Sequence, residues 1–245
     1  MRIAYHNYLK NATLTANTEH PNFPVSNLKI RSLETTFRTT GTTLTLVMDL
    51  GAAKAINIFL IGSHNFTGSA TVTLEANSAD SWGPPAFTTT ITDRSDIIAH
   101  TLSSTQTYRY WRLSVSDASN ADGYIEIARP TPDSYFQVPA VERQRPTDES
   151  DTQRIITPGG RVYANVGRTY QSIEVQFGGY LTVTEREDFR DMWRFIGTGF
   201  PIFLIQHEDD LATYPALHVV LDGNLSWNTD QFDRSGVTLK FLEVR

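Results

Sequence analysis

The stretch that decides the fold is Thr43-Leu44-Thr45-Leu46-Val47-Met48-Asp49-Leu50, in which apolar side chains recur at every second position. Because successive side chains of a β-strand point to opposite faces of the sheet, this alternation predicts a strand with one buried face. The following run, Ile56-Asn57-Ile58-Phe59-Leu60-Ile61, is apolar almost throughout. It predicts a second strand that is covered on both faces.

Shorter segments of the same kind occur on the C-terminal side of this pair, at residues 71–76, 110–115 and 124–127. Loops that contain Gly, Asn, Asp and Pro separate them. Several short strands with such loops are typical of a β-sandwich or jelly roll. We therefore expect a jelly-roll β-sandwich in the first half of the chain.

One amphipathic helix is predicted in the second half. Thr184 and Glu187 have the spacing of a capping box, and Gly197 can end the helix. Its apolar stripe follows the i, i+3, i+4, i+7 spacing and consists of Phe189, Met192, Trp193 and Ile196. Strand patterns flank the helix at 172–177, 201–205 and 236–241, and residues 218–225 predict a hairpin that turns at Asp222-Gly223. The second half is therefore expected to be α+β, a β-sandwich or barrel with this one helix, in a mainly β protein.

A domain boundary is expected between the two halves. Five of the 11 prolines fall there, at positions 130, 132, 139, 146 and 158. Proline lacks a backbone donor and restricts the residue before it, so regular structure is not expected to cross this segment. We predict a domain at 1–130, a linker at 131–154 and a second domain at 155–245.

Composition excludes several classes of function. The 245 residues carry 21 Lys and Arg against 27 Asp and Glu, a net charge of −6, and no cysteine. An acidic chain is a poor ligand for a phosphate backbone, so no specific nucleic acid is expected as a partner. Without cysteine there is no disulfide, thiolate metal site or thiol nucleophile. The sequence shows neither an apolar export signal at its start nor an apolar run of membrane-spanning length.

Motifs for catalysis are absent as well. The sequence contains no Gly-x-Ser-x-Gly elbow, phosphate-binding loop or HExxH metal motif. Glu187 and Asp191 share a helix face, as acid and base of a glycosidase could, but an exposed helix surface explains them more simply. We expect a protein that is not an enzyme and keep a glycosidase with a binding module as the weakest alternative.

Residues 10–130 resemble the discoidin-like, galactose-binding-fold domains, in the version found in phage structural proteins. The resemblance rests on the order of weak fragments at 19–28, 35–40, 49–56, 62–66, 70–74, 110–115 and 123–127. It implies a jelly roll whose loops at one end often bind sugar and which often holds a structural calcium ion.

The resemblance also implies candidate site residues. Glu126 matches an acidic residue that frequently binds the calcium, whereas residues 28–33 lack the Asp-Gly that many relatives carry there. The sequence therefore predicts no cofactor beyond this structural calcium ion. For sugar, we expect Trp82 as a stacking platform, with His64 and Arg94 on the same loop rim.

Residues 155–245 resemble the minor and distal tail proteins at the tail tip of long-tailed phages. The fragments that carry this are 160–162, 167–170, 173–177, the capped helix, 197–204 and 217–221, followed by Trp227 and 239–244. The resemblance implies a ring-forming homo-oligomer that joins the tail tube to the hub of the tail tip.

Together these resemblances predict a structural protein of the virion, located at the tail tip and assembled in the host cytoplasm. Its partners would be copies of itself, the tail tube and hub proteins, and in some cases tail fibres. The alternative hypothesis is a carbohydrate-binding adhesin whose jelly roll contacts glycans of the host surface.

Overall fold

A computed structural model describes residues 1–138, 141–150, 152–156, 158, 162–165, 167–177, 181–207, 210–211, 213–231 and 234–244. The chain is 54% strand and 11% helix, with antiparallel sheets and a single α-helix in the described residues, which confirms the mainly β prediction. It divides into two compact units. The first combines Met1–Gln137 with Phe203–Leu217, and the second combines Val138–Ile202 with His218–Val244.

The first unit is built around one antiparallel sheet, with the strand order β3-β8-β4-β7-β5-β6 and β2 paired to β4. Its strands are β2 (Thr13–Ala16), β3 (Phe37–Arg38), β4 (Thr43–His64), β5 (Thr71–Asn77), β6 (Phe87–Ile91), β7 (Ile98–Ser116) and β8 (Glu126–Asp133). Two short 3₁₀ turns, η1 (Tyr8–Asn11) and η2 (Val25–Lys29), pack beside it.

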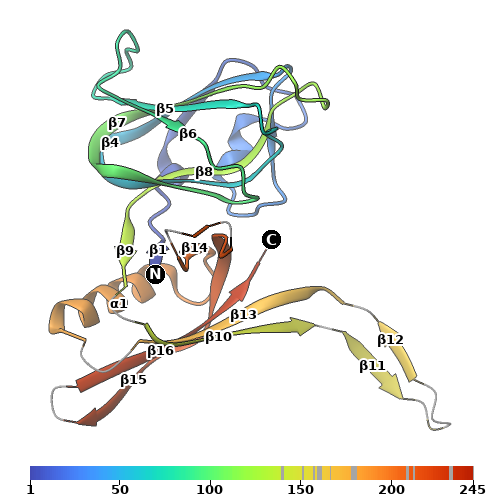
Figure 1. Ribbon diagram of the computed structural model, residues 1–245, viewed down its shortest axis with the longest axis vertical. Helices are drawn as coiled ribbons and strands as arrows, with labels where there is room; N and C mark the ends of the chain where they lie inside the picture. The colour runs from blue at the N-terminus through green and yellow to red at the C-terminus, as the bar shows by residue number, and fades with distance from the viewer. Residues whose placement is uncertain are drawn as a thin grey trace. The chain divides into compact units, whose positions relative to one another are not determined.

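The two strands predicted at 43–50 and 56–61 are one continuous strand, β4. Its pairing with β7 shifts register between Asp49 and Lys54, next to Gly51 with φ 76°. Such irregularities bend a strand. The long β4–β7 ribbon curves over (Figure 1), and apolar side chains of both strands lie in one core. Trp111, fully buried, is the largest side chain of that core.

A second, small group of strands completes the first unit. Strand β1 (Arg2–Ala4) pairs antiparallel with β9 (Tyr135–Gln137) and with β14 (Ile202–Ile205). Phe203 and Ile205 of β14 pack with Ile58 and Leu60 of β4 in a separate apolar cluster. The first unit is therefore completed by a strand from far downstream in the sequence.

The proline-rich segment differs from the predicted linker 131–154. The boundary between the units falls inside it, at 137/138, but strands β8, β9 and β10 (Val141–Ser150) run through it. Pro146 lies in β10, which is an edge strand: it stands at the end of the strand order and pairs with β13 on one side. Pro130 and Pro132 pair with β4, beyond the short β3. Proline is tolerated at such edge positions because no ladder requires its missing N–H.

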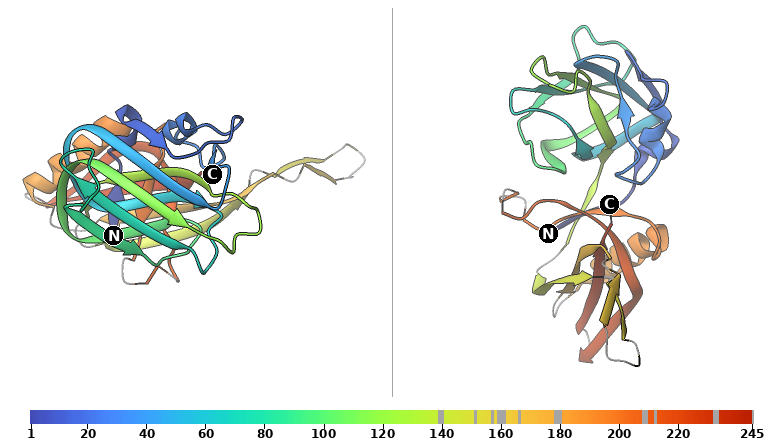
Figure 2. Two further views of the ribbon diagram at one scale, coloured as in Figure 1. Left: turned by 90° about the horizontal axis from the view of Figure 1, so that it is seen from above. Right: turned by 90° about the vertical axis from the view of Figure 1, so that its right-hand side faces the viewer.

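The second unit is an antiparallel sheet with one helix. Strands β10, β13 (Thr169–Phe177), β16 (Arg234–Glu243) and β15 (Leu217–Gln231) follow one another in the sheet, and β11 (Gln153–Ile156) and β12 (Val162–Asn165) form a separate hairpin that extends from β10 and β13 (Figures 1 and 2). Helix α1 (Val183–Ile196) buries Phe189, Met192 and Ile196 as predicted, whereas Trp193, the fourth residue of the predicted stripe, is half-buried. The rings of Phe189 and Phe177 lie 5.1 Å apart.

Two local predictions in this unit need correction. The capping box uses Thr182 and Glu185 rather than Thr184 and Glu187, which begins the helix earlier, directly after the buried Leu181. Asp222-Gly223 does not turn a hairpin: β15 continues through Gly223, with φ 98° and a register shift against β16. A positive φ serves a bulge as well as a turn. Residues 232–233, between β15 and β16, lie outside the described residues.

No α-helix in the described part of the chain is long and apolar enough to cross a membrane.

Candidate functional site

The best candidate site begins with a tight turn at His20-Pro21-Asn22-Phe23. The Phe23 N–H donates to the His20 carbonyl at 2.9 Å, and proline at the second position of a turn presets its backbone. The turn is fastened to β3, because the His20 N–H donates to the Arg38 carbonyl and the Arg38 N–H to the Phe23 carbonyl, at 2.8 and 3.1 Å. Arg38 is thereby held beside this turn.

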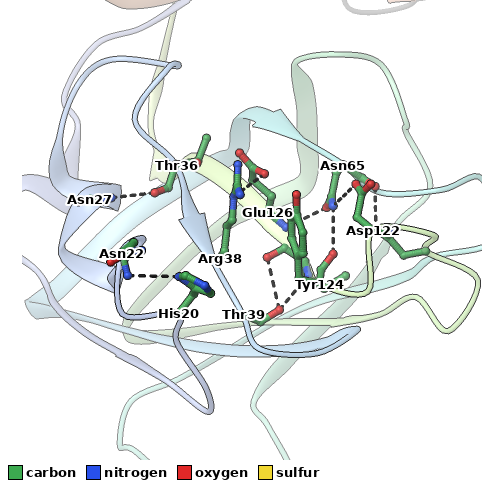
Figure 3. Close-up of polar contacts among 12 residues, drawn as sticks. His20, Asn22, Asn27, Thr36, Arg38, Thr39, Asn65, Asp122, Tyr124 and Glu126 are labelled. Atoms are coloured by element: carbon green, nitrogen blue, oxygen red, sulfur yellow. Dashed lines mark hydrogen bonds and ion pairs between the residues drawn. The ribbon is translucent and has the colours of Figure 1, made fainter.

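The opposite side of the site is held by Asn65. Its Nδ2 donates to the Tyr124 carbonyl and to Asp122, each at 3.0 Å, and its Oδ1 accepts the Glu126 N–H at 2.8 Å. Thr39 Oγ1 accepts the neighbouring Ile125 N–H at 2.8 Å. These contacts fix the backbone of 124–126 before any ligand arrives (Figure 3).

The Arg38 guanidinium lies over two aromatic rings, 3.8 Å from the centroid of Phe23 and 4.9 Å from that of Tyr124. Its Nε lies 2.8 Å from Oε2 of Glu126 on β8 and makes no hydrogen bond, so this contact is ionic (Figure 3). The side chains keep 28% (Arg38) and 20% (Glu126) of their surface exposed. A pair this exposed stabilises folding by about 1 kcal/mol or less. His20 stacks at an angle on Phe23, 5.5 Å away. We call His20, Phe23, Arg38, Tyr124 and Glu126 the Arg38 site.

The chemistry of the Arg38 site suits hydroxyl groups. Arginine offers only hydrogen-bond donors and a carboxylate only acceptors, whereas each hydroxyl both donates and accepts. His20 Nδ1 accepts the Asn22 N–H at 3.2 Å, which leaves Nε2 to carry the ring proton. The aromatic rings add apolar surface beside these polar groups. A molecule with neighbouring hydroxyls on a carbon ring would use all of them.

The calcium ion expected at Glu126 does not fit this arrangement. The Arg38 guanidinium already neutralises the Glu126 carboxylate. Calcium takes six to eight oxygen ligands, usually with several carboxylates. Among the described residues no three His, Asp or Glu side chains converge as such a site requires.

Trp82 lies away from the other two candidate sugar-binding residues. Its loop leaves β5 at Asn77, which pairs with Tyr110, whereas the Arg38 site lies toward the other end of β5, where Thr71 pairs with Ser116. Trp82 Nε1 donates to Asp80 at 2.8 Å, and the Arg112 guanidinium lies 4.5 Å from its ring. The expected single rim with His64 and Arg94 is therefore not formed, because the strand separates the two loops.

His64 and Arg94 do lie together, but both hold the loop at 91–97. His64 Nε2 donates to the Ser95 carbonyl at 2.9 Å, while Nδ1 accepts the Phe66 N–H at 3.1 Å. Burial lowers the pKa of His64 below its ordinary value, and the hydrogen bond to Ser95, which acts in the opposite direction, only partly offsets it. Arg94 donates to three backbone carbonyls, of Ile91, Asp93 and Ala70. Both side chains are thus engaged in structural contacts.

A Ser-His-Asp group near the N-terminus has the residues of a catalytic triad but not its geometry. Ser134 Oγ and Asp133 Oδ1 approach the same nitrogen, Nδ1 of His6, at 3.1 and 3.3 Å. A triad needs serine and aspartate on opposite ring nitrogens. Burial lowers the pKa of His6, but the hydrogen bond and charge of Asp133 and the Ser134 carbonyl outweigh it, so the pKa is raised overall. This group fastens the N-terminal segment to 133–134.

The paired carboxylates Glu187 and Asp191 are both exposed on α1, and Asp191 pairs with Arg194 at 3.2 Å. No cleft encloses them in the described structure of the helix; the nearby hollow of about 280 Å³ is lined by Arg190, Trp193, Arg194 and Leu225.

Sequence reasoning selected Glu126 for a different role and missed Arg38, Phe23 and Tyr124. All three lie in fragments that carry the resemblance to discoidin-like domains, at 19–28, 35–40 and 123–127. The available signal was the occurrence of Arg38 and Glu126 on two of these fragments, together with aromatic residues on the fragments of the same set.

No protein-family model matches the sequence, and no curated protein matches it. Solved structures do match about half of the chain. Chitosan-binding module 1 of a chitosanase/glucanase from Paenibacillus sp. IK-5 is 20% identical, with a TM-score of 0.42, over 53% of this chain and 99% of the module. The family 32 carbohydrate-binding module of C. perfringens NanJ, solved with galactose, is 16% identical, with a TM-score of 0.41, over 56% and 100%. A fucose-binding module from Streptococcus pneumoniae is 12% identical, with a TM-score of 0.42, over 54% and 98%.

Proposed function

We propose that the N-terminal unit is a carbohydrate-binding module that holds a sugar at the Arg38 site. The observation that carries this proposal is the Arg38–Glu126 pair, 2.8 Å apart and partly exposed, with the guanidinium over the rings of Phe23 and Tyr124. Donor, acceptor and apolar surface lie within one small area, as recognition of a polyhydroxylated ring requires.

The rigidity of the site supports the same proposal. The backbone on both sides is fixed by hydrogen bonds from Asn65, Thr39 and the 20–23 turn. A site that is ordered before binding loses less conformational entropy when the ligand arrives. This smaller loss of conformational entropy matters more for weakly binding ligands, such as single sugars, than for large partners.

The experiment is calorimetric titration of the full chain with galactose, N-acetylgalactosamine, fucose and chitosan oligomers. For a sugar that binds, Arg38→Ala and Tyr124→Ala should each weaken the affinity by roughly tenfold or more, a loss of about 1.4 kcal/mol or greater. Trp82→Ala is the matched control, an aromatic truncation in the loop at the other end of β5. Affinity lost in Trp82→Ala and kept in Arg38→Ala would overturn the proposal.

A further inference from the structure

The charge of Arg38 is already compensated within the site. Glu126 is its ionic partner at 2.8 Å, on the adjacent strand, and in the described residues no second acidic group pairs with the guanidinium. A lone arginine on an exposed surface would attract carboxylate, sulfate or phosphate groups, because its fork of donors matches them. At this site the carboxylate of Glu126 already occupies that role.

From this, and resting on the proposed sugar-binding function, we propose that Glu126 is a specificity-determining residue. It makes the Arg38 site select neutral sugars and reject sugars that carry a carboxylate or sulfate. An anionic group that reached Arg38 would also lie within a few ångströms of Glu126. By Coulomb's law the attraction and the repulsion are then of similar size.

A second negative charge strengthens the discrimination. Asp122 is exposed and accepts a hydrogen bond from Asn65, which also holds Tyr124. Arg38, Glu126 and Asp122 together carry one net formal negative charge. A neutral hydroxyl still finds a donor in Arg38 and an acceptor in Glu126, whereas an anion meets a net repulsion from the three charges.

The chain offers a matched control in the Arg112–Glu75 pair. Its Nε and Oε2 atoms lie 2.5 Å apart, the side chains are 21% and 13% exposed, and the guanidinium lies over Trp82. It thus repeats the arginine, glutamate and aromatic ring of the Arg38 site. Its ladder position is on the β5–β7 pair, away from β3 and β8.

The test measures affinities of the full chain for two matched ligand pairs, D-galactose with D-galacturonate and D-glucose with D-glucuronate. Within each pair only the group at carbon 6 changes, from hydroxymethyl to carboxylate. For the pair whose hexose binds, the wild-type chain should prefer the hexose by roughly tenfold or more. Glu126→Gln keeps the size of the side chain and removes its charge, so this preference should fall to about one or reverse. Glu75→Gln should leave the preference unchanged.

The outcomes separate the two proposals. A wild-type chain that binds none of these four sugars, and none of N-acetylgalactosamine, fucose and chitosan oligomers, removes the sugar-binding function and this inference with it. Binding confined to those last three ligands keeps the function and overturns the inference alone. Wild-type chain that binds a hexose and its uronate equally well overturns the inference alone, as does an unchanged preference in a folded Glu126→Gln. If Glu126→Gln does not fold, Asp122→Asn on the exposed rim takes its place; a smaller shift toward the uronate supports the inference, and no shift contradicts it.

Discussion

Replacing Phe203 with alanine tests whether β14 is an integral part of the N-terminal unit. Phe203 is 1% exposed and belongs to the apolar cluster with Ile58 and Leu60. The guanidinium of Arg129, itself 3% exposed, lies 4.5 Å from its ring. Burial, followed by the charge of Arg31, lowers the pKa of Arg129 to about 9. The aromatic ring therefore supports an otherwise poorly solvated cation.

Truncating a buried phenylalanine costs about 3–5 kcal/mol through lost transfer energy and the cavity that remains. Losing the ring beneath a desolvated arginine adds about 1–2 kcal/mol. We expect Phe203→Ala to lower the free energy of unfolding of the N-terminal unit by about 5 kcal/mol, a fall in Tm of roughly 10–20 °C for a unit of this size. Phe200→Ala, three residues earlier and 46% exposed in the wild type, should cost about 1 kcal/mol or less.

Because the chain has two units, one melting temperature does not report on either alone. Hydrogen exchange measured by mass spectrometry resolves them: Phe203→Ala should accelerate exchange in peptides of β4 and β7 and leave peptides of α1 unchanged. A cost under about 1 kcal/mol, or faster exchange confined to α1, would refute the assignment of β14 to the first unit.

Two further predictions concern local contacts. His6→Gln should reduce the stability of the N-terminal unit, measured by urea unfolding, more at pH 5.5 than at pH 8.5. Because the pKa of His6 is raised, its contact with Asp133 stabilises the fold fully below the unfolded pKa near 6.5, and this stabilisation is lost as the pH rises through the folded pKa. An equal loss of stability at both pH values would contradict this prediction. Thr182→Ala should destabilise α1 by about 1 kcal/mol, measured by hydrogen exchange of the helix, and Thr184→Ala by clearly less; the reverse order would place the helix cap at Thr184.

Periodicity in the sequence predicts those parts of the fold that depend on neighbours within one element. The stripe of α1 is confirmed for Phe189, Met192 and Ile196, with Trp193 half-buried, and the strand predicted at 201–205 is confirmed as β14. The same patterns do not show how far an element continues. Asp222-Gly223 is compatible with a turn and with a bulge, and only pairing with β16 decides between them.

The site was harder to predict because its residues are joined across strands. Arg38 and Glu126 are partners through the β3–β8 ladder, which no spacing in the sequence records. Trp82 is a plausible sugar platform by residue type, but the register of β5 places its loop at the other end of the strand. The virion role, the ring oligomer with its tail partners, the location at the tail tip and the absence of enzyme activity stay predictions.

The return of β14 to the first unit has a consequence for how the protein is made. Ile58 and Leu60 receive their covering side chains from Phe203 and Ile205, which the ribosome adds only after the first part of the second unit. At a translation rate of about 5–20 residues per second, the apolar face of the nascent first unit stays uncovered for several seconds before β14 is synthesised. Each unit is also assembled from two separated pieces of the chain, so no single cut in the gene separates the two units from each other.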